Sequence, residues 1–351
     1  MQEELKSLRS DQRWDGIYLV IVFTLLLGLV SIGFATLSPI HWCWLIPFMG
    51  WVQYYIVISG HEAVHKTLCP KKWLNEGIGV LGQAMIGVNF TAYRLQHIDH
   101  HRAPTYESDP DAHIYMGVMR QQPGWKRFVW LTAGTFIEIV IKIRQKGVEG
   151  YGTKRDIKPV IQASMRRDSA LVILCQLCWM GLGWWLLSLH TLWPDEALVS
   201  FTNFGAFGVT AKLGVELVLS YAIFWTIPLF CITVFLNRCR IVIEHGLALA
   251  IVEAQTTFNG SRIPTVEVRP SKIEQWIFSP FMFNYHSSHH MYMTVPFYHL
   301  PKLNALMNER FSTSDNSVGY LEYSNGYLQA LWTVVNHPYT APIQKTSVAV
   351  N

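Results

Sequence analysis

Residues 41–65 read HWCWLIPFMGWVQYYIVISGHEAVH, an apolar run that ends in two histidines. The part from 41 to 60 contains no Asp, Glu, Lys or Arg, and about 20 apolar residues with a rise of 1.5 Å each suffice to cross a bilayer as a helix. His61 and His65 lie four residues apart, so a helix that continues from this run places both side chains on one face. The stretch therefore predicts a membrane span with two metal-ligand side chains at its end.

Three more runs are long and apolar enough to cross a membrane. Together with the first run they predict spans at about 17–37, 41–60, 170–193 and 213–236. The chain of 351 residues is 50% apolar and only 15% charged, whereas soluble domains carry about 25% charged residues. We therefore expect an all-α integral membrane protein with about four transmembrane helices. Two shorter apolar segments, 77–92 and 128–143, are predicted to be interfacial or re-entrant.

Basic residues gather in one of the connections between the predicted spans. The connections 38–40 and 194–212 contain almost none. The long connection between the second and third spans holds Lys142, Arg144, Lys146, Lys154, Arg155, Lys158, Arg166 and Arg167. Positively charged loops face the cytoplasm, so this multi-pass chain is expected to have that loop and both termini on the cytoplasmic side.

The same pattern divides the chain into three predicted parts. A cytoplasmic N-terminal tail covers 1–16, a membrane domain covers 17–303, and a cytoplasmic C-terminal tail covers 304–351. Beyond Arg238 the chain becomes polar and has no further run long enough to cross. That part is expected to form a cytoplasmic cap.

Several other functional classes find no support in the composition. The net charge of +4 comes without a basic stripe, so no nucleic-acid partner is expected. Cys175 and Cys178 lie inside an apolar run, which favours two small core side chains over a redox motif. The glycines of GIGVLG at 77–82 match a dinucleotide fingerprint only in letters, because no strand precedes them. They are expected to allow close helix packing.

Nine of the 14 histidines form a pattern that extends the first pair. HIDHH contains His97, His100 and His101; HSSHH contains His286, His289 and His290; and His245 follows the fourth span in RIVIEHG. Offsets of three and four residues project from one helical face. The spans predicted between these motifs let all nine residues meet on the cytoplasmic side. The five scattered histidines, His41, His113, His190, His299 and His337, are interpreted as surface or interface side chains.

Nine imidazoles are too many ligands for a single metal ion. Zinc takes about four ligands and octahedral iron about six, so two ions that share the nine fit the count. Imidazole suits several metals, and redox chemistry on an apolar chain favours iron over zinc. Nearby carboxylates are expected to accept the second ring N–H of the ligands; these are Glu62, Asp99, Asp109, Asp111 and Glu244.

These motifs resemble those of the membrane fatty-acid desaturase superfamily. The resemblance rests on HEAVH, on HIDHH followed by SDPD at 108–111, and on HSSHHMYMTVPFYHLPKL at 286–303, and it covers roughly Gly50 to Leu303. It implies a di-iron site at the cytosolic ends of four spanning helices, O2 as co-substrate, and a fatty acid or fatty acyl chain held in an apolar tunnel between the spans.

The resemblance also implies how the ligands divide. One iron would be held by His61, His101, His286 and His290, and the other by His65, His97, His100, His245 and His289. Some relatives carry an Asn four residues before the histidine that matches His245, where this chain has Ile241. No His-Pro-Gly-Gly haem motif of a fused cytochrome b5 is present. Electrons are therefore expected from a separate ferredoxin, rubredoxin or cytochrome b5 type donor with its reductase.

Several reactions fit such a site. The leading hypothesis is a fatty-acid desaturase that introduces a C=C bond. The alternatives are an oxidative decarboxylase that converts free fatty acids to terminal alkenes, and a carotenoid ketolase or hydroxylase. From a different class, HEAVH also fits the H-E-x-x-H motif of a membrane zinc metalloprotease with Glu62 as general base, although that reading leaves both H-x-x-H-H motifs unexplained. A non-catalytic receptor or transporter with a metal-stabilised mouth would bind metal without consuming oxygen.

Overall fold

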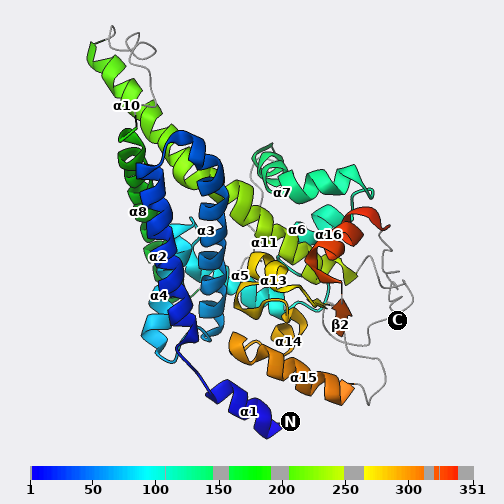
Figure 1. Ribbon diagram of the computed structural model, residues 1–351. Coiled ribbons are helices and arrows are strands. Elements are labelled where there is room, and N and C mark those ends of the chain that lie inside the picture. The colour runs from blue at the N-terminus through cyan, green and yellow to red at the C-terminus, as the bar shows by residue number, and fades with distance from the viewer. Residues whose placement is uncertain are drawn as a thin grey trace. The chain divides into compact units, whose positions relative to one another are not determined.

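The computed structural model describes residues 2–106, 108–144, 158–190, 205–248, 265–311, 320–323 and 325–338. The chain divides into two compact units. One unit comprises Asp11–Leu95 and Asp156–Leu236, and the other comprises Met1–Ser10, Gln96–Arg155 and Asn237–Asn351. This division differs from the predicted continuous membrane domain 17–303, because distant parts of the sequence alternate between the units. Figure 1 labels the elements.

The unit that contains Asp11–Leu95 is built from long apolar helices. Its elements are α2 (Asp15–Thr36), η1 (Pro39–His41), α3 (Trp42–His65), α4 (Lys72–Met85), α8 (Pro159–Ser188), α10 (Gly205–Tyr221), and the π-helical turns η2 (Ala222–Thr226) and η3 (Leu229–Thr233). Four helices are long and apolar enough to cross a membrane: Asp15–Thr36, Pro39–His65, Pro159–Ser188 and Val209–Gly246. The predicted fold class, helical with four spanning helices, is confirmed.

The third helix differs most from its predicted span of 170–193. It begins at Pro159 with a proline in its first turn, where the missing N–H costs nothing, so Arg166 and Arg167 lie in the helix and not in the basic loop. The helix ends at Ser188, and residues 191–193 lie outside the described residues. So do Lys146, Lys154 and Arg155 of the loop that was used to predict the orientation.

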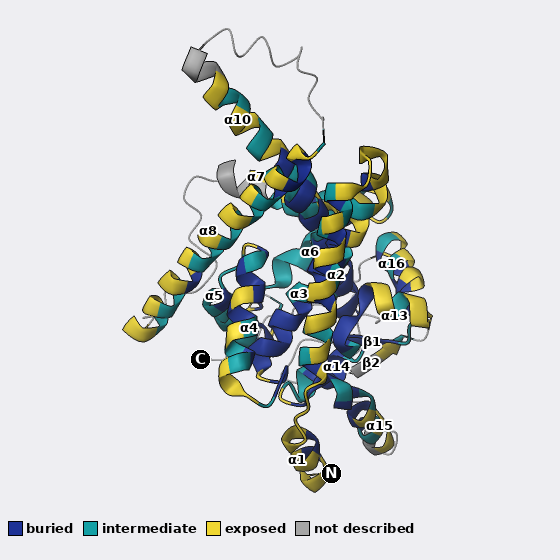
Figure 2. Cartoon of the chain, turned by 60° about the vertical axis from the view of Figure 1, so that its left-hand side comes forward, coloured by how far each residue is buried: buried dark blue, intermediate teal, exposed yellow. Residues whose placement is uncertain are grey.

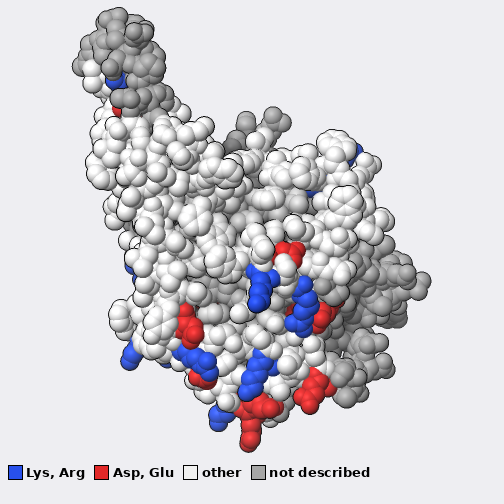
Figure 3. Space-filling view, in the orientation of Figure 1, with Lys and Arg blue, Asp and Glu red and all other residues white. Residues whose placement is uncertain are grey.

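The spanning helices expose their apolar side chains. Leu25 on α2 is 65% exposed and Ile173 on α8 is 63% exposed. Figure 2 shows exposed residues along most of α8 and α10, and the surface over most of α2 in Figure 3 is uncharged. Large apolar patches are rare on soluble proteins, whereas a lipid-facing helix requires them.

Polar side chains inside this unit bind backbone carbonyls where the fourth helix is π-helical. Gln53 on α3 is fully buried and its Nε2 donates to the carbonyl oxygen of Trp225, at 3.2 Å. Thr233 Oγ1 donates to the carbonyl oxygen of Gly50 at 2.6 Å. A Cβ on Gly50 would lie 2.6 Å from the carbonyl oxygen of Pro228, so glycine permits this close approach. These bonds fix α3 against the fourth helix within the unit.

The second unit contains short helices and one small sheet. Its elements are α1 (Gln2–Ser10), most of α5 (Phe90–Arg102), α6 (Ala112–Met119), α7 (Trp125–Arg144), α11 (Val234–Ile241), η4 (Val242–Gly246), β1 (Thr265–Val268), α13 (Lys272–Phe278), η5 (Pro280–Met282), α14 (His286–Met291), η6 (Phe297–His299), α15 (Leu300–Phe311), β2 (Tyr320–Tyr323) and α16 (Gly326–Asn336). The predicted tail 304–351 thus contains β2 and α16 as well as most of α15.

Strands β1 and β2 form a two-stranded parallel sheet, with Thr265 opposite Tyr320 and Val268 opposite Tyr323. Every residue of β1 is buried. A second contact links α7 to the end of α16. The buried guanidinium of Arg127 on α7 donates to the carbonyl oxygens of Val334 and His337, each at 2.6 Å. The C-terminal helix is therefore fixed to α7.

Candidate metal centre

Four histidines from three parts of the sequence form one cluster in the second unit. They are His100 on α5, His245 on η4, and His286 and His290 on α14, with one ring nitrogen of each within 4.8 Å of the others. The Nε2 atoms of His245 and His286 are 2.9 Å apart. The rings of His100 and His290 have centroids 4.9 Å apart and meet at right angles. Four imidazoles in this arrangement offer the ligand set of one metal ion.

A carboxylate orients the first of these imidazoles. His100 Nδ1 lies 2.8 Å from Asp109 Oδ1, and the hydroxyl of the buried Tyr115 donates to Asp109 Oδ2 at 2.6 Å. With its proton on Nδ1, His100 keeps this bond and presents Nε2 to a metal. Burial by itself raises the pKa of Asp109, but the hydrogen bond from His100 opposes this and the pKa lies below its ordinary value. The acceptor is thus an ionised carboxylate.

A second carboxylate lies behind His286. Glu244 Oε2 accepts a hydrogen bond of 2.5 Å from the guanidinium of Arg240 and lies 3.3 Å from His286 Nδ1. Glu244 and His245 both belong to the π-helical turn η4, a local geometry that often occurs at functional sites. Arg240 in turn stacks over the ring of Phe283, 4.2 Å from its centroid. The carboxylate is therefore positioned by an arginine that is itself held in place.

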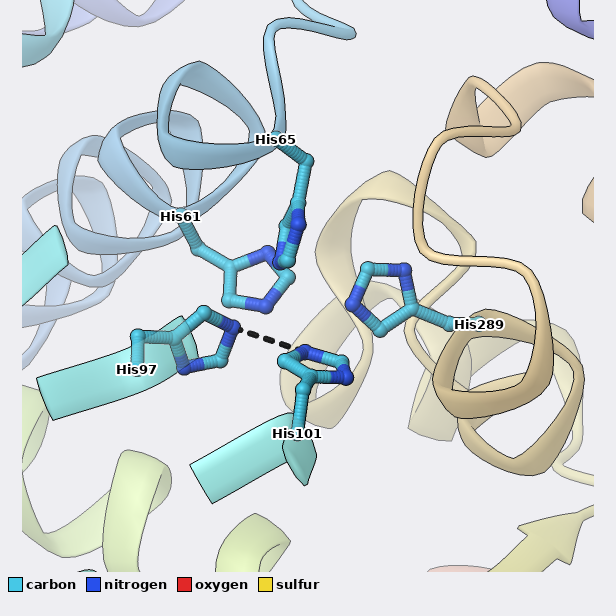
Figure 4. A group of neighbouring side chains, drawn as sticks. All are labelled: His61, His65, His97, His101 and His289. Carbon is cyan, nitrogen blue, oxygen red and sulfur yellow. Dashed lines mark hydrogen bonds between the residues drawn. The ribbon is translucent and has the colours of Figure 1, made fainter. Parts of the chain in front are cut away.

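Three further histidines of the same unit form a second cluster. His97 and His101 on α5 have their Nε2 atoms 2.9 Å apart, and the ring of His289 on α14 lies 4.9 Å from that of His101. Figure 4 shows the His97–His101 contact as a dashed line, with His289 beside it. Residues four positions apart on a helix project from the same face, which is the spacing of helical metal-ligand pairs.

This clustering differs from the ligand division that the resemblance implied. His101 lies with His97 and His289, not with His286 and His290, whereas His100 and His245 do lie with His286 and His290. The reason is helical geometry, because consecutive residues point about 100° apart. His100 and His101 therefore face different clusters, and His97 shares the side of His101.

His61 and His65 belong to the other unit, at the end of α3, with ring centroids 4.8 Å apart. The end of that helix is fixed by α4. Asn75 Nδ2 donates to the carbonyl oxygen of Ala63 at 2.8 Å, and Gln83 Nε2 donates to the carbonyl oxygen of Val57 at 3.0 Å. A Cβ on Gly60 would lie 1.8 Å from Gln83 Nε2, so a larger residue at position 60 would displace the Gln83 amide from this contact.

Glu62 stands between these two histidines in sequence and supports the first of them. Its Oε1 lies 3.3 Å from His61 Nδ1, and its Oε2 accepts a hydrogen bond of 2.8 Å from Thr67 Oγ1. The carboxylate is buried. A carboxylate on Nδ1 recurs at His61, His100 and His286, which leaves Nε2 of each ring for a metal.

The donor set fits a metal that binds neutral imidazoles. Burial and the neighbouring imidazoles lower the pKa of His286 and of His290, so both rings are neutral, as metal binding requires. Within the described chain, the buried Nδ1 of His245 and Oε1 of Glu244 lack a hydrogen-bond partner. Buried polar atoms without partners are rare. The two atoms therefore agree with a region that binds a metal ion or another ligand.

The comparison with known sequences agrees with the geometry. A sequence model of a family described as fatty acid desaturase matches residues 38–321, a range that includes all nine histidines. This chain belongs to the fatty acid desaturase family. A search of curated proteins finds no match. Membership makes this desaturase-family chain a membrane oxidoreductase with a fatty acyl substrate, and its buried histidine clusters agree with metal binding.

The other predicted site residues of this desaturase-family chain have the following contacts and burial. Asp111 lies 3.9 Å from His100 Nδ1 and accepts a hydrogen bond from Gln96. Asp99 is half-buried, and its predicted role as an acceptor for a ligand stays a prediction. Of the scattered histidines, His113 binds the carbonyl oxygen of Pro110, and His190 that of Phe34.

The sequence analysis missed three supporting residues: Tyr115, Arg240 and the buried Glu267 on β1. Each acts through a partner distant in the chain or on another turn. Arg240 lies four residues before Glu244, a spacing that typifies helical ion pairs. It was the only one of the three that a helical-wheel reading could have found.

Proposed function

We propose that this protein is a di-iron, O2-dependent fatty-acyl desaturase that introduces a C=C bond. The observation that carries the proposal is the buried cluster of His100, His245, His286 and His290, in which the Nε2 atoms of His245 and His286 meet at 2.9 Å. Family membership supports the acyl substrate. Iron is preferred over zinc because hydrogen removal from an unactivated carbon needs a redox-active metal.

The nine histidines are proposed to hold two irons. One ligand set is the cluster His100, His245, His286 and His290. The remaining five, His61, His65, His97, His101 and His289, are proposed as the second ligand set. A division into four and five leaves positions open on each ion, because octahedral iron takes about six ligands. Open positions are what a dioxygen-using site requires.

Bound iron would supply the oxidising power to remove hydrogen from a C–H bond with O2 as co-substrate. The residues of the chain would orient the metal ligands. Asp109 and Glu62 hold the rings of His100 and His61 through Nδ1, which directs Nε2 of each ring toward a metal. Glu244 lies 3.3 Å from Nδ1 of His286 and would add negative charge near the metal. Burial of these groups excludes water, which protects the oxidant from side reactions.

Regiochemistry would follow from how the apolar unit positions the acyl chain. Reacting atoms must be held within about 3–3.5 Å of each other, and the spanning helices are proposed to line an apolar tunnel for that chain. The site and both termini are proposed to face the cytoplasm in a multi-pass topology. Electrons are proposed to come from a separate ferredoxin, rubredoxin or cytochrome b5 type protein with its reductase.

Two other reactions use the same proposed machinery. Oxidative decarboxylation would release carbon dioxide and leave a terminal alkene, and a carotenoid oxidase would act on a ring. A zinc protease would need Glu62 as general base. The engagement of Glu62 by Thr67 and His61 favours an orienting role for this carboxylate.

Product analysis tests the proposal. Purified protein in nanodiscs is analysed for metal and incubated with one defined saturated fatty acid or its acyl thioester, a reducing system and O2. About two irons per chain and an internal alkene of unchanged length are the expected result. An olefin one carbon shorter would show decarboxylation, ring oxidation of an added carotenoid would show the third reaction, and one zinc with peptide hydrolysis would overturn the proposal. His286→Ala is the inactive control.

A further inference from the structure

The third histidine motif lies on a short helix that needs support from neighbouring elements. Helix α14 has six residues, and its N-cap residue Tyr285 makes no side-chain capping bond. Helices this short are unstable in isolation, and their first N–H groups need partners from elsewhere. Three of the nine proposed ligands, His286, His289 and His290, nevertheless depend on this helix.

Strand β1 supplies the missing support through Glu267. This carboxylate is fully buried. Its Oε1 accepts the backbone N–H of Ser288 at 2.8 Å and the Ser288 hydroxyl at 2.5 Å. Ser288 directly precedes His289 and follows His286 by two positions. A negative charge at the N-terminal turn also interacts favourably with the helix dipole.

The rest of β1 reinforces the same contact. Thr265 Oγ1 donates to Ser287 Oγ at 2.9 Å, and the backbone N–H of Val268 donates to the carbonyl oxygen of Asn284 at 3.1 Å. The strand therefore binds the start of α14 at three successive points. Glu267 is the charged member of the three.

The second carboxylate oxygen of Glu267 accepts from a side chain whose donor and acceptor ends are fixed. Asn304 Nδ2 on α15 donates to Glu267 Oε2, and Asn304 Oδ1 accepts a hydrogen bond of 2.7 Å from the guanidinium of Arg269. Arg269 also donates to Glu322 at 2.9 Å. The arginine fixes the orientation of the Asn304 amide, so that its NH2 group must face an acceptor at position 267.

We propose that Glu267 is a positioning residue for the metal centre, because it fixes the helix that carries His286, His289 and His290. This inference rests on the proposed function, since it takes these three histidines as iron ligands. Glu267 acts through Ser288 and not by contact with substrate or metal. Partners that orient metal ligands typically contribute 10–100-fold to metal affinity, and a similar loss is expected when this bond network is broken.

The test exploits the polarity of the network. Glu267→Gln keeps an oxygen for Ser288 but places an NH2 group against the NH2 group of Asn304. The double variant Glu267→Gln with Asn304→Asp restores every donor–acceptor pair and the net charge, because the new aspartate accepts from both Arg269 and the introduced amide. Glu322→Gln is the control, since it changes a carboxylate bound to Arg269 on the surface.

Iron affinity is measured by competition with a chelator, and the iron environment by Mössbauer spectroscopy. Glu267→Gln is expected to lower affinity at least tenfold and to broaden the spectrum, whereas the double variant and Glu322→Gln stay within about threefold of wild type. Wild-type affinity in Glu267→Gln would overturn the proposal, and so would a double variant as weak as the single one.

A second measurement separates this inference from the proposed function. Hydrogen exchange of the peptide that contains 286–291 is measured in metal-free protein. Faster exchange in Glu267→Gln and recovery in the double variant are expected whether the site takes iron or another metal, and unchanged exchange would overturn the positioning role. Wild-type protein that binds no iron would contradict the proposed function alone.

Discussion

His245 and His286 have their Nε2 atoms 2.9 Å apart although 41 positions separate them in the chain. His245 lies in the π-helical turn η4, and His286 is the first residue of the six-residue helix α14. Two rings that present the same nitrogen to one point are candidate ligands for one metal ion. Loss of one such ring cannot be compensated by a neighbour that faces the other cluster.

Removal of one proposed ligand from either cluster is expected to abolish turnover. His100→Ala affects the four-histidine cluster and His289→Ala the second cluster. Both variants should insert into the membrane as wild type does, because the spanning helices are untouched. The exposed His337 is the control, and His337→Ala should be near neutral. Product formation and iron content are the measurements; turnover at the wild-type rate in either ligand variant contradicts the assignment.

The carboxylate that holds His100 is expected to matter more than the tyrosine behind it. Asp109→Asn should reduce iron affinity or activity by about 10–100-fold, since the orienting charge is lost. Tyr115→Phe removes one of the hydrogen bonds to Asp109 and should have a smaller effect. Chelator competition on both variants gives the ranking, and a reversed order would show that Tyr115 has a role beyond orienting Asp109.

The close approach of α4 to the histidine pair on α3 predicts a glycine requirement. Gly60→Ala places a Cβ 1.8 Å from Gln83 Nε2 and should cost about 1–3 kcal/mol of stability together with a loss of bound iron. The matched control is Gly77→Ala on α4, where a Cβ meets nothing within 4 Å and alanine is the better helix former. Thermal unfolding in detergent compares the two; equal midpoints would contradict the packing argument.

The carboxylate of Glu274, which links α13 to α16, is expected to contribute to the stability of the fold in a pH-dependent way. Burial opposes ionisation of Glu274, but the backbone N–H groups of Leu328 and Ser271 outweigh it and lower its pKa. A lowered pKa stabilises the fold above the unfolded-state pKa and the effect disappears as pH falls through the folded-state pKa. Glu274→Gln should therefore cost about 1 kcal/mol at pH 7 and much less once the pH is below the folded-state pKa of Glu274.

Thermal unfolding of wild type and Glu274→Gln at several pH values measures this difference. The expected result is two curves that converge on the acid side. Glu322→Gln is a useful comparison, because the pKa of Glu322 is also lowered, in that case first by its hydrogen bond from Arg269. A difference for Glu274→Gln that grows as pH falls would contradict the sign of the argument.

The sequence predicted the helical membrane class because apolar run length is a local property. It also placed HIDHH and HSSHH on helices, as the structure has them in α5 and α14. Helix boundaries were less predictable. The third helix starts at Pro159, well before the apolar run begins, because a helix can continue through charged residues such as Arg166 and Arg167.

The division of the ligands and the supporting residues depend on tertiary contacts. The family resemblance grouped His101 with His286, whereas the direction of side chains around α5 groups it with His97. Glu267 sits on a four-residue strand whose partner lies far along the chain, so no periodicity marked it. The sequence therefore pointed to the histidines and to carboxylates beside them, such as Asp109, but not to Tyr115 or Glu267, whose contacts depend on the tertiary fold.

The parallel pairing of β1 with β2 also constrains biosynthesis. Strand β1 supports the third histidine motif, yet its partner Tyr320–Tyr323 is synthesised well after it. Such a long-range pairing forms late because the intervening chain must first be closed into a loop. A chain cut short before Tyr320 would keep its long apolar helices but lack the strand partner of β1, so we expect such a chain to hold α14 less firmly than the full-length chain.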